Sequence, residues 1–159
     1  MTNVDIRSAT ASDADTILGF ITELAIYEKA EHEVLASAED IARTLNNNEA
    51  HALICSHEGK AIGFALYFFN YSTWVGRPGL FLEDLYVSSE YRGKGAGKAL
   101  LVYLARLAKQ NGCGRFEWNV LDWNEPAINF YRSIGAKPQD EWITYRLDVA
   151  GISALAENG

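Results

Sequence analysis

The sequence is poor in cysteine, methionine and proline. Its 159 residues include two cysteines, one methionine and three prolines. Cys55 and Cys113 lie far apart without a partner pattern, so we expect two reduced thiols in the core rather than a disulfide or a thiolate site. His32, His51 and His57 show no ligand spacing with the cysteines or with one another, and we expect no metal.

Long apolar runs and positive charge are also scarce. The longest apolar run, Ala61 to Phe69, is too short to cross a bilayer, and no cationic and apolar leader precedes the first expected strand. The formal net charge of −7 repels polyanions, which argues against nucleic acid and anionic membranes and favours the approach of cations. We expect a soluble, cytoplasmic protein. Acidity often serves solubility alone, so a cationic ligand requires acids that cluster.

The size and composition indicate one globular domain spanning residues 1–159. The apolar share of 48% and the charged share of 22% suffice for a single core. No repeats, linkers or low-complexity segments interrupt the chain.

A strand, a glycine-rich turn and a helix organise the sequence from Phe81 to Leu101. Phe81 to Val87 favours a strand, Ser88 to Gly97 a turn, and a helix is expected from Lys98 onward. Glycines at 93, 95 and 97 allow successive N–H groups to converge on an anion at the positive end of the helix dipole. This pattern predicts a phosphate cradle.

Two common phosphate loops do not fit this cradle. A Walker loop requires glycine where Arg92 stands and a hydroxyl residue where Ala99 stands. The dinucleotide fingerprint requires a different glycine spacing and a place on the first strand of the domain. A nicotinamide cofactor is therefore not expected.

The remaining patterns predict a mixed α/β sheet flanked by helices. Strands that alternate around the turn at 57–60 should form an antiparallel hairpin, and the strand, helix and strand that span the cradle should form a right-handed crossover with parallel strands. The expected strands are Val4–Arg7, Ala50–Ser56, Ala61–Tyr71, Phe81–Val87, Arg115–Val120 and Trp142–Val149. The expected helices follow Thr10 or Ser12, cover Ala38–Leu45, run from Lys98 to a stop at Gly112, and extend from Pro126 to Ile134.

The cradle resembles the pyrophosphate loop of the GCN5-related N-acetyltransferases (GNAT superfamily), in which Arg or Gln, two residues and Gly precede one residue and Gly or Ala. Arg92, Gly95 and Gly97 fill this pattern. Its expected neighbours are present: Glu83 and Asp84 before it, Trp123-Asn124-Glu125-Pro126 and Asn129-Phe130-Tyr131 after it. From about Ile6 to Leu147 the chain is similar to spermidine/spermine (diamine) and thialysine acetyltransferases.

The resemblance implies the GNAT fold and acetyl-CoA as cosubstrate. The coenzyme would be held by residues of the strand end, the cradle and the later helix: Leu85, Tyr86, Val87, Arg92, Gly93, Lys94, Gly95, Ala96, Gly97, Lys98, Asn124, Glu125, Pro126, Ala127 and Tyr131. If the strand is regular, Asp84 faces away from Glu83, but the resemblance implies a bulge just beyond it.

Glu83 and Tyr131 are the candidate catalytic residues. By resemblance, Glu83 takes the proton of the amine through a water; it alternatively only anchors the cation, or is a solvent-facing acid. Tyr131 matches the family's acid for the leaving thiolate. Its phenol, of pKa about 10, stays protonated at neutral pH and faces a thiolate of pKa about 8.5. Neither cysteine adjoins a recognisable base, so we expect direct transfer without an acyl-enzyme.

The implied substrate is the primary amine of a small cation, such as spermidine or a diamine. The candidate binding residues are aromatic or acidic: Tyr27, Glu28, Trp74, Glu83, Asp84 and Trp123. Ser72-Thr73-Trp74 replaces the Asp-Pro-Trp of the polyamine enzymes, so a thialysine-like or lysine-like amino acid is a serious rival. A non-catalytic acyl-CoA sensor is a second alternative. Homodimerisation is implied only by resemblance, with the C-terminal strand as a possible exchanged element.

Overall fold

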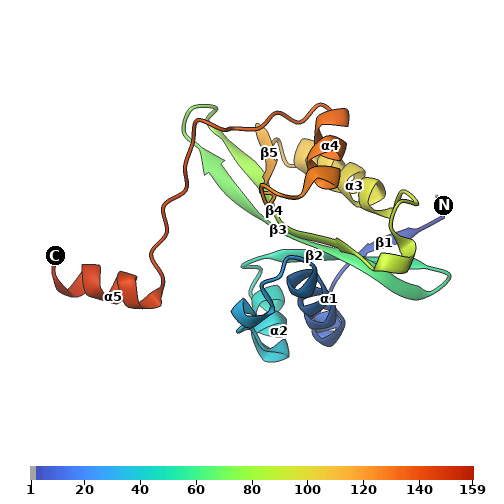
Figure 1. The fold of residues 1–159 in the computed structure, drawn as a ribbon, viewed down its shortest axis with the longest axis horizontal. Helices are drawn as coiled ribbons and strands as arrows, with labels where there is room; N and C mark the ends of the chain where they lie inside the picture. Colours follow the sequence, from blue (N-terminus) through green and yellow to red (C-terminus); the bar gives the residue numbers. More distant parts are fainter. Residues whose placement is uncertain (1–2) are drawn as a thin grey trace. The chain divides into compact units, whose positions relative to one another are not determined.

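The computed structural model describes residues 3–159 and contains a five-stranded mixed sheet (Figure 1). The strand order is β1-β2-β3-β4-β5, and every neighbouring pair is antiparallel except β4 with β5, which is parallel. This arrangement confirms the expected α/β class, the antiparallel hairpin and the parallel crossover. The strands are β1 (Asp5–Ser8), β2 (His51–His57), β3 (Lys60–Ser72), β4 (Arg77–Val87) and β5 (Arg115–Trp118).

The chain divides after Leu121 into two units. The first holds the sheet with its helices, and the second contains two further helices; each is described by itself. The helices of the first unit are η1 (Ala11–Asp13), α1 (Ala14–Tyr27), η2 (Glu31–Glu33), α2 (Ala38–Asn46), η3 (Ser89–Tyr91) and α3 (Ala96–Gln110). Those of the second are α4 (Glu125–Ser133) and α5 (Val149–Glu157). In the part of the chain that the structure describes, no helix is long and apolar enough to cross a membrane.

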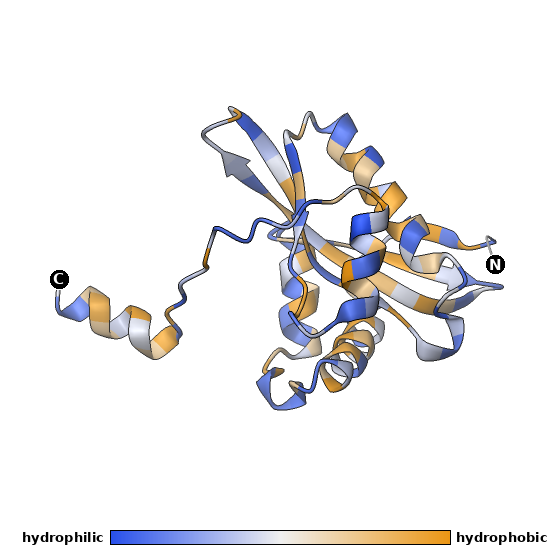
Figure 2. Cartoon of the chain, turned by 45° about the horizontal axis from the view of Figure 1, so that its top comes forward, coloured by the Kyte–Doolittle hydropathy of each residue, from blue (hydrophilic) through white to orange (hydrophobic). Residues whose placement is uncertain are grey.

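Helices cover both faces of the sheet in the first unit, with α1 and α2 on one face and α3 on the other (Figure 1). Phe20 of α1 stacks on Phe64 of β3, with ring centroids 5.8 Å apart, and lies 6.0 Å from the ring of Tyr86 on β4. On the opposite face, Leu100 and Leu104 of α3 are fully buried. Figure 2 shows apolar and polar bands along these helices, and the buried residues of α1 and α3 are all apolar, as in helices that pack with one apolar face.

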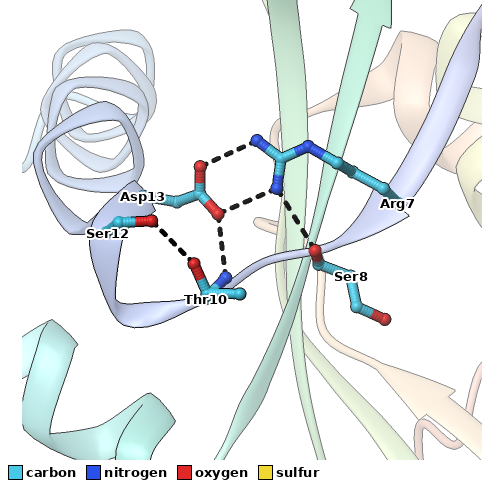
Figure 3. Close-up of polar contacts among 5 residues, drawn as sticks. All are labelled: Arg7, Ser8, Thr10, Ser12 and Asp13. Atoms are coloured by element: carbon cyan, nitrogen blue, oxygen red, sulfur yellow. Dashed lines mark hydrogen bonds and ion pairs between the residues drawn. The ribbon is translucent and has the colours of Figure 1, made fainter.

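A charged cluster joins the first strand to the first helical turn (Figure 3). Both guanidinium nitrogens of Arg7 donate to the carboxylate of Asp13, at 2.9 and 2.8 Å, and the same carboxylate accepts the backbone N–H of Thr10 at 2.8 Å. These hydrogen bonds lower the pKa of Asp13 from 3.8 to about 2. The carboxylate therefore caps the turn and fixes the direction in which the chain enters α1.

The expected strand at Trp142–Val149 is wrong. Residues 142–148 form no strand, and Val149 already begins α5, which the sequence analysis missed. The segment does alternate apolar and polar residues, but a strand also needs a partner to take its backbone hydrogen bonds, and none of the described strands pairs with it. Asp148 instead accepts the N–H of Gly151 at 2.8 Å and caps the helix.

Element boundaries differ by smaller amounts elsewhere. Helix α3 begins at Ala96, two residues before the expected Lys98, because Gly95 already acts as the N-cap with φ of 95°. Strand β5 ends at Trp118 rather than Val120. Gly112, with φ of 67°, ends α3 as expected, and the N–H of Cys113 donates to Ala108 O at 2.9 Å.

The Arg7–Asp13 pair generates a pH-dependent prediction. Because the pKa of Asp13 is lowered in the folded chain, its stabilising effect is fully present above pH 3.8 and is lost as the pH falls through about 2. We expect Asp13→Asn to lower the free energy of unfolding by about 1–2 kcal/mol, a value reduced for the exposure of Arg7. Urea unfolding should show this difference unchanged from pH 7 to 5 and shrinking at pH 3. Asp15→Asn, an exposed acid of the same region, is the control and should change stability little.

Candidate active site

A β-bulge at Glu83 interrupts the pairing of β4 with β3. Leu82 pairs with Tyr67 and Asp84 pairs with Leu66, so Glu83 has no partner in the register. Leu66 and Tyr67 are adjacent on β3 and face opposite sides, and Leu82 and Asp84 must therefore also face opposite sides. The bulge turns Asp84 to the same face as Tyr86, the face that α1 covers. The resemblance had implied a bulge just beyond Asp84, but the bulge lies one residue before it, at Glu83.

Two acidic side chains, Glu83 and Glu28, act on the carboxyl group of Asp84 beside this bulge. Asp84 and Glu28 are partly buried, whereas Glu83 is exposed. Burial, and then the charges of Glu83 and Glu28, raise the pKa of Asp84 from 3.8 to about 6. Burial also raises the pKa of Glu28, which follows the last residue of α1. The acids expected to bind a cation thus cluster, and the one with the strongly shifted pKa is Asp84, which the sequence analysis had treated only as a binding residue.

Strand β4 has an open edge after the bulge. Its parallel pairing with β5 covers Gly79 to Leu82 and ends there, while its pairing with β3 continues to Val87. The N–H of Ser88 donates to Ile62 O at 2.8 Å, and the alternation of an antiparallel ladder then directs the N–H groups of Leu85 and Val87 away from β3. The N–H of Tyr86, between them, faces β3. Leu85 and Val87 therefore offer donors at an edge that the described part of β5 does not pair.

The cradle follows directly at the end of this edge. Gly93 and Gly95 have φ of 74° and 95°, the left-handed region that only glycine enters without strain. The N–H of Ala99 donates to Gly95 O at 3.0 Å as the first intrahelical bond, so the N–H groups of Ala96, Gly97 and Lys98 lie in the first turn without an intrahelical acceptor. A Cβ at Gly93 would meet no heavy atom within 4 Å, so the loop backbone is open to a ligand.

Positive side chains surround the cradle. Lys94 donates to Glu90 O at 3.1 Å and lies 5.8 Å from the centroid of the Tyr91 ring, and Lys98 is exposed on the first turn of α3. Together with the convergent N–H groups, these lysines fit a diphosphate, and the open edge at Leu85 and Val87 fits a chain with amide carbonyls. These groups could hold a ligand that carries a diphosphate and a chain of amide carbonyls, and their role in binding acetyl-CoA stays a prediction.

Arg92, the first residue of the loop pattern, folds back toward the sheet. Its Nε–H donates to Val87 O at 2.9 Å. Its guanidinium carbon lies 4.9 Å from the ring centroid of Tyr27 and 5.2 Å from that of Tyr86. The arginine expected to contact the coenzyme therefore also contacts Tyr27, an expected substrate residue at the end of α1.

The later motif residues belong to the second unit. Asn124 caps α4 as expected, because its Oδ1 accepts the N–H of Ala127 at 3.4 Å, and Pro126 lies in the first turn. Tyr131 lies on α4 with its ring centroid 5.8 Å from that of Phe130. Trp123, Glu125 and Ala127 adjoin the start of this helix. The roles of these residues in coenzyme binding and proton transfer stay predictions.

Trp74 lies on the connection between β3 and β4, after Ser72. Its side chain is 81% exposed. Leu66, opposite Asp84, is separated from Ser72 by a stretch of β3 that spans roughly 20 Å. Trp74 and the acid cluster therefore occupy different ends of the hairpin within this chain. A role of Trp74 in amine binding stays a prediction.

The two cysteines are free, as expected. Burial, with a smaller effect of Asp5, raises the pKa of Cys55 to about 11, and burial also raises the pKa of Cys113. Both thiols are thus protonated at neutral pH and are poor nucleophiles, which agrees with direct transfer. Residues 3–159 contain no group of three or more histidine, cysteine or acidic side chains placed to hold a metal ion, and metal-independent chemistry stays a prediction.

Comparison with known proteins identifies relatives along the whole chain. The Acetyltransferase (GNAT) family matches residues 19–136. The chain is 37% identical to the thialysine N-epsilon-acetyltransferase of Mus musculus, over 98% of this chain and 99% of the mouse protein. It is 34% identical to the human spermidine/spermine N(1)-acetyltransferase-like protein 1, over 90% of this chain and 22% of that protein. A solved integron cassette protein of V. cholerae superposes with a TM-score of 0.80, at 29% identity and 99% coverage of both chains.

The raised pKa of Asp84 predicts that the acid cluster destabilises the fold. The native state binds an extra proton between pH 3.8 and about 6, so stability falls as the pH rises through this range. We expect Asp84→Asn to raise the free energy of unfolding by about 1–3 kcal/mol at pH 7.5 and by little at pH 4. Glu83→Gln should give a smaller gain, since it removes only the second cause. Asp140→Asn, an exposed acid of the second unit, is the control in urea unfolding; equal stability of Asp84→Asn and wild type at pH 7.5 would contradict the prediction.

Proposed function

This chain belongs to the GNAT family of acetyltransferases, and we propose that it transfers acetyl directly from acetyl-CoA to a primary amine on a small cation. It is an N-acetyltransferase, as its full-length relatives at 35–37% identity are. The observation that supports a cationic substrate is the cluster of Glu28, Glu83 and Asp84, in which burial, and then repulsion by Glu83 and Glu28, raise the pKa of Asp84 to about 6. An ammonium group placed among these acids offsets that repulsion. Binding of the amine therefore removes an unfavourable interaction of the free protein, which increases the affinity for the amine.

The proposed substrate is a short alkyl amine that carries a second charged group. Thialysine is the first candidate, because the mouse relative named for it covers nearly the whole chain and because Ser72-Thr73-Trp74 departs from the polyamine pattern. Spermidine and short diamines are the second, supported by the human spermidine/spermine-like relative. A sensor without catalysis has no comparable support.

Acetyl-CoA supplies the activated acetyl group, and the protein must supply a neutral amine. An alkyl amine of pKa about 10.4 is less than about 0.1% neutral at pH 7, so deprotonation costs roughly 4.6 kcal/mol of the barrier. We propose that Asp84 and Glu28 bind the ammonium and that Glu83, exposed at the bulge, accepts its proton through water. Asp84 is a second candidate acceptor, because a carboxylate whose pKa is about 6 is a stronger base than one of pKa 3.8.

The backbone and the second unit complete the proposed roles. Leu85 and Val87 donate N–H groups to the pantetheine arm and its acyl carbonyl, and the loop from Gly93 to Lys98 holds the diphosphate. From α4, the hydroxyl of Tyr131 protonates the leaving sulfur, and Asn124 contacts the pantetheine arm. Residues 1–159 would then act as one catalytic domain.

We also propose that the protein is a homodimer in the cytoplasm. Exposed apolar residues alternate with polar ones near the C-terminus: Trp142, Ile143, Tyr145, Leu147 and Val149. Such a row is typical of a segment that pairs with another chain, so a second copy is the proposed partner, which light scattering can test. The two free thiols agree with a reducing compartment, and fractionation of the source cells would test the location.

An amine panel tests the proposed activity. The protein is mixed with acetyl-CoA and thialysine, lysine, spermidine or putrescine, and free thiol is followed over time in the presence of EDTA. We expect thiol release with at least one of these amines, and the highest kcat/KM with thialysine. Binding of CoA by calorimetry without thiol release under any amine would contradict the transferase proposal, and the highest kcat/KM with spermidine would contradict the choice of thialysine.

A single substitution tests the proposed acid. We expect Tyr131→Phe to lower turnover about 10²- to 10⁴-fold, because the ring is kept and only the proton donor is lost. Calorimetry should find the affinity for CoA largely unchanged. Tyr71→Phe, at an exposed position of β3, is the matched control and should retain wild-type turnover. Wild-type turnover in Tyr131→Phe would remove this residue from the mechanism.

A further inference from the structure

Arg92 joins three parts of the first unit through its side chain. The guanidinium carbon lies over the rings of Tyr27 and Tyr86, at 4.9 and 5.2 Å from their centroids, and the Nε–H of Arg92 donates to Val87 O at 2.9 Å. Tyr27 ends α1, Tyr86 and Val87 end β4, and Arg92 itself opens the glycine loop. One side chain therefore contacts the helix that leads to Glu28, the strand that carries Asp84, and the loop proposed for the diphosphate.

The chemistry of this contact suits arginine in particular. A guanidinium is planar, so it can place a face against each of two rings while its edge still donates to a carbonyl. Lysine keeps the charge but offers neither the flat face nor a donor in the same plane. Tyr86 also responds to α1, because burial and then the charge of Glu23 raise its pKa, whereas the charge of Arg92 lowers it.

The contact adjoins the acid cluster along the chain. Glu23 and Tyr27 are four residues apart and share one face of α1, where the charge of Glu23 acts on Tyr86 and the ring of Tyr27 contacts Arg92. Glu28 follows Tyr27 directly and its charge acts on Asp84. A shift of Arg92 would therefore move Tyr27 and change the distance between these two carboxyl groups.

We propose that Arg92 is a positioning residue that couples the coenzyme loop to the amine-binding acids. This inference rests on the proposed function, since it takes the loop and the acids to be the two substrate sites. CoA bound at the loop restricts the backbone around Gly93 and Gly95. Because Arg92 contacts Tyr27, this restriction also reduces the motion of the end of α1. Binding of CoA then raises the affinity for the amine, and by linkage the amine raises the affinity for CoA by the same factor.

The coupling is measured as a ratio of dissociation constants. Calorimetry gives the Kd of thialysine, and in parallel of spermidine, without CoA and with saturating unacetylated CoA. In the wild type we expect CoA to lower the amine Kd about 5- to 20-fold, within the usual range of coupling between sites. A residue that merely stabilises the fold would change both constants equally and leave the ratio unaltered.

Four variants separate the coupling from other effects. Arg92→Lys and Tyr27→Leu should each reduce the ratio of amine Kd values to below about 2-fold. The ratio in the double variant should be no lower than in either single variant. Tyr27→Phe keeps the ring and should keep the ratio. Lys60→Met is the matched control, because it removes a cation 5.6 Å from the Tyr91 ring and no contact with α1. Thermal unfolding of each variant checks that the comparison is made on folded protein.

Hydrogen exchange gives a readout that needs no amine. The backbone N–H groups of residues 28, 29 and 30 donate to the carbonyl oxygens of Leu24, Ile26 and Ala25 at the end of α1, at 2.9, 3.1 and 2.8 Å respectively. We expect CoA to slow their exchange in the wild type and in Tyr27→Phe, but not in Arg92→Lys.

The possible failures are distinguishable. If the wild type transfers acetyl and Arg92→Lys keeps both the wild-type coupling ratio and the wild-type slowing of exchange by CoA, this inference is overturned and the proposed function stays intact. Wild-type protein that binds CoA but neither amine would overturn the proposed substrate class and the inference together. Wild-type protein that does not bind CoA would overturn the proposed function itself.

Discussion

The arrangement of the site depends on the extra residue in β4. Glu83 has no partner on β3, and this single insertion changes which face the following residues occupy. Before it, β4 pairs with strands on both sides and is an ordinary central strand; after it, pairing with β5 has ended and the strand has one open edge. The same irregularity therefore turns Asp84 toward α1 and exposes the N–H groups of Leu85 and Val87. The acid cluster and the open edge of β4 thus both begin at this bulge.

The site is organised by contacts that oppose stability as well as by contacts that support it. Asp84 is partly buried among other acids, a placement that a fold selected only for stability would avoid. The nearby Arg92 supplies positive charge but is held by aromatic rings and a carbonyl rather than by these acids. The guanidinium thus contacts the surrounding elements and does not pair with these carboxylates in any of its hydrogen bonds or ring contacts described above.

Local patterns in the sequence predicted the parts of the structure that depend on local chemistry. Alternation around Gly59, the glycines at 93–97 and the Asn124 cap correctly predicted the hairpin, the glycine loop before α3 and the start of α4, because turns and caps are set by neighbouring residues. The bulge at Glu83 was not located, since register depends on pairing between distant segments. The contact of Arg92 with Tyr27 was not predicted either. Residues 142–148 have the sequence pattern of a strand, but no described strand pairs with them.

The state of the two thiols has a practical consequence for kinetic work. Cys55 is buried with a pKa of about 11, and the pKa of Cys113 is raised as well, so few protein thiolates exist at neutral pH. Disulfide dyes that detect newly liberated coenzyme react with thiolates, and the enzyme itself should contribute only a slow, small background to such a signal. Continuous colorimetric recording is therefore compatible with the native cysteines, without replacing either of them.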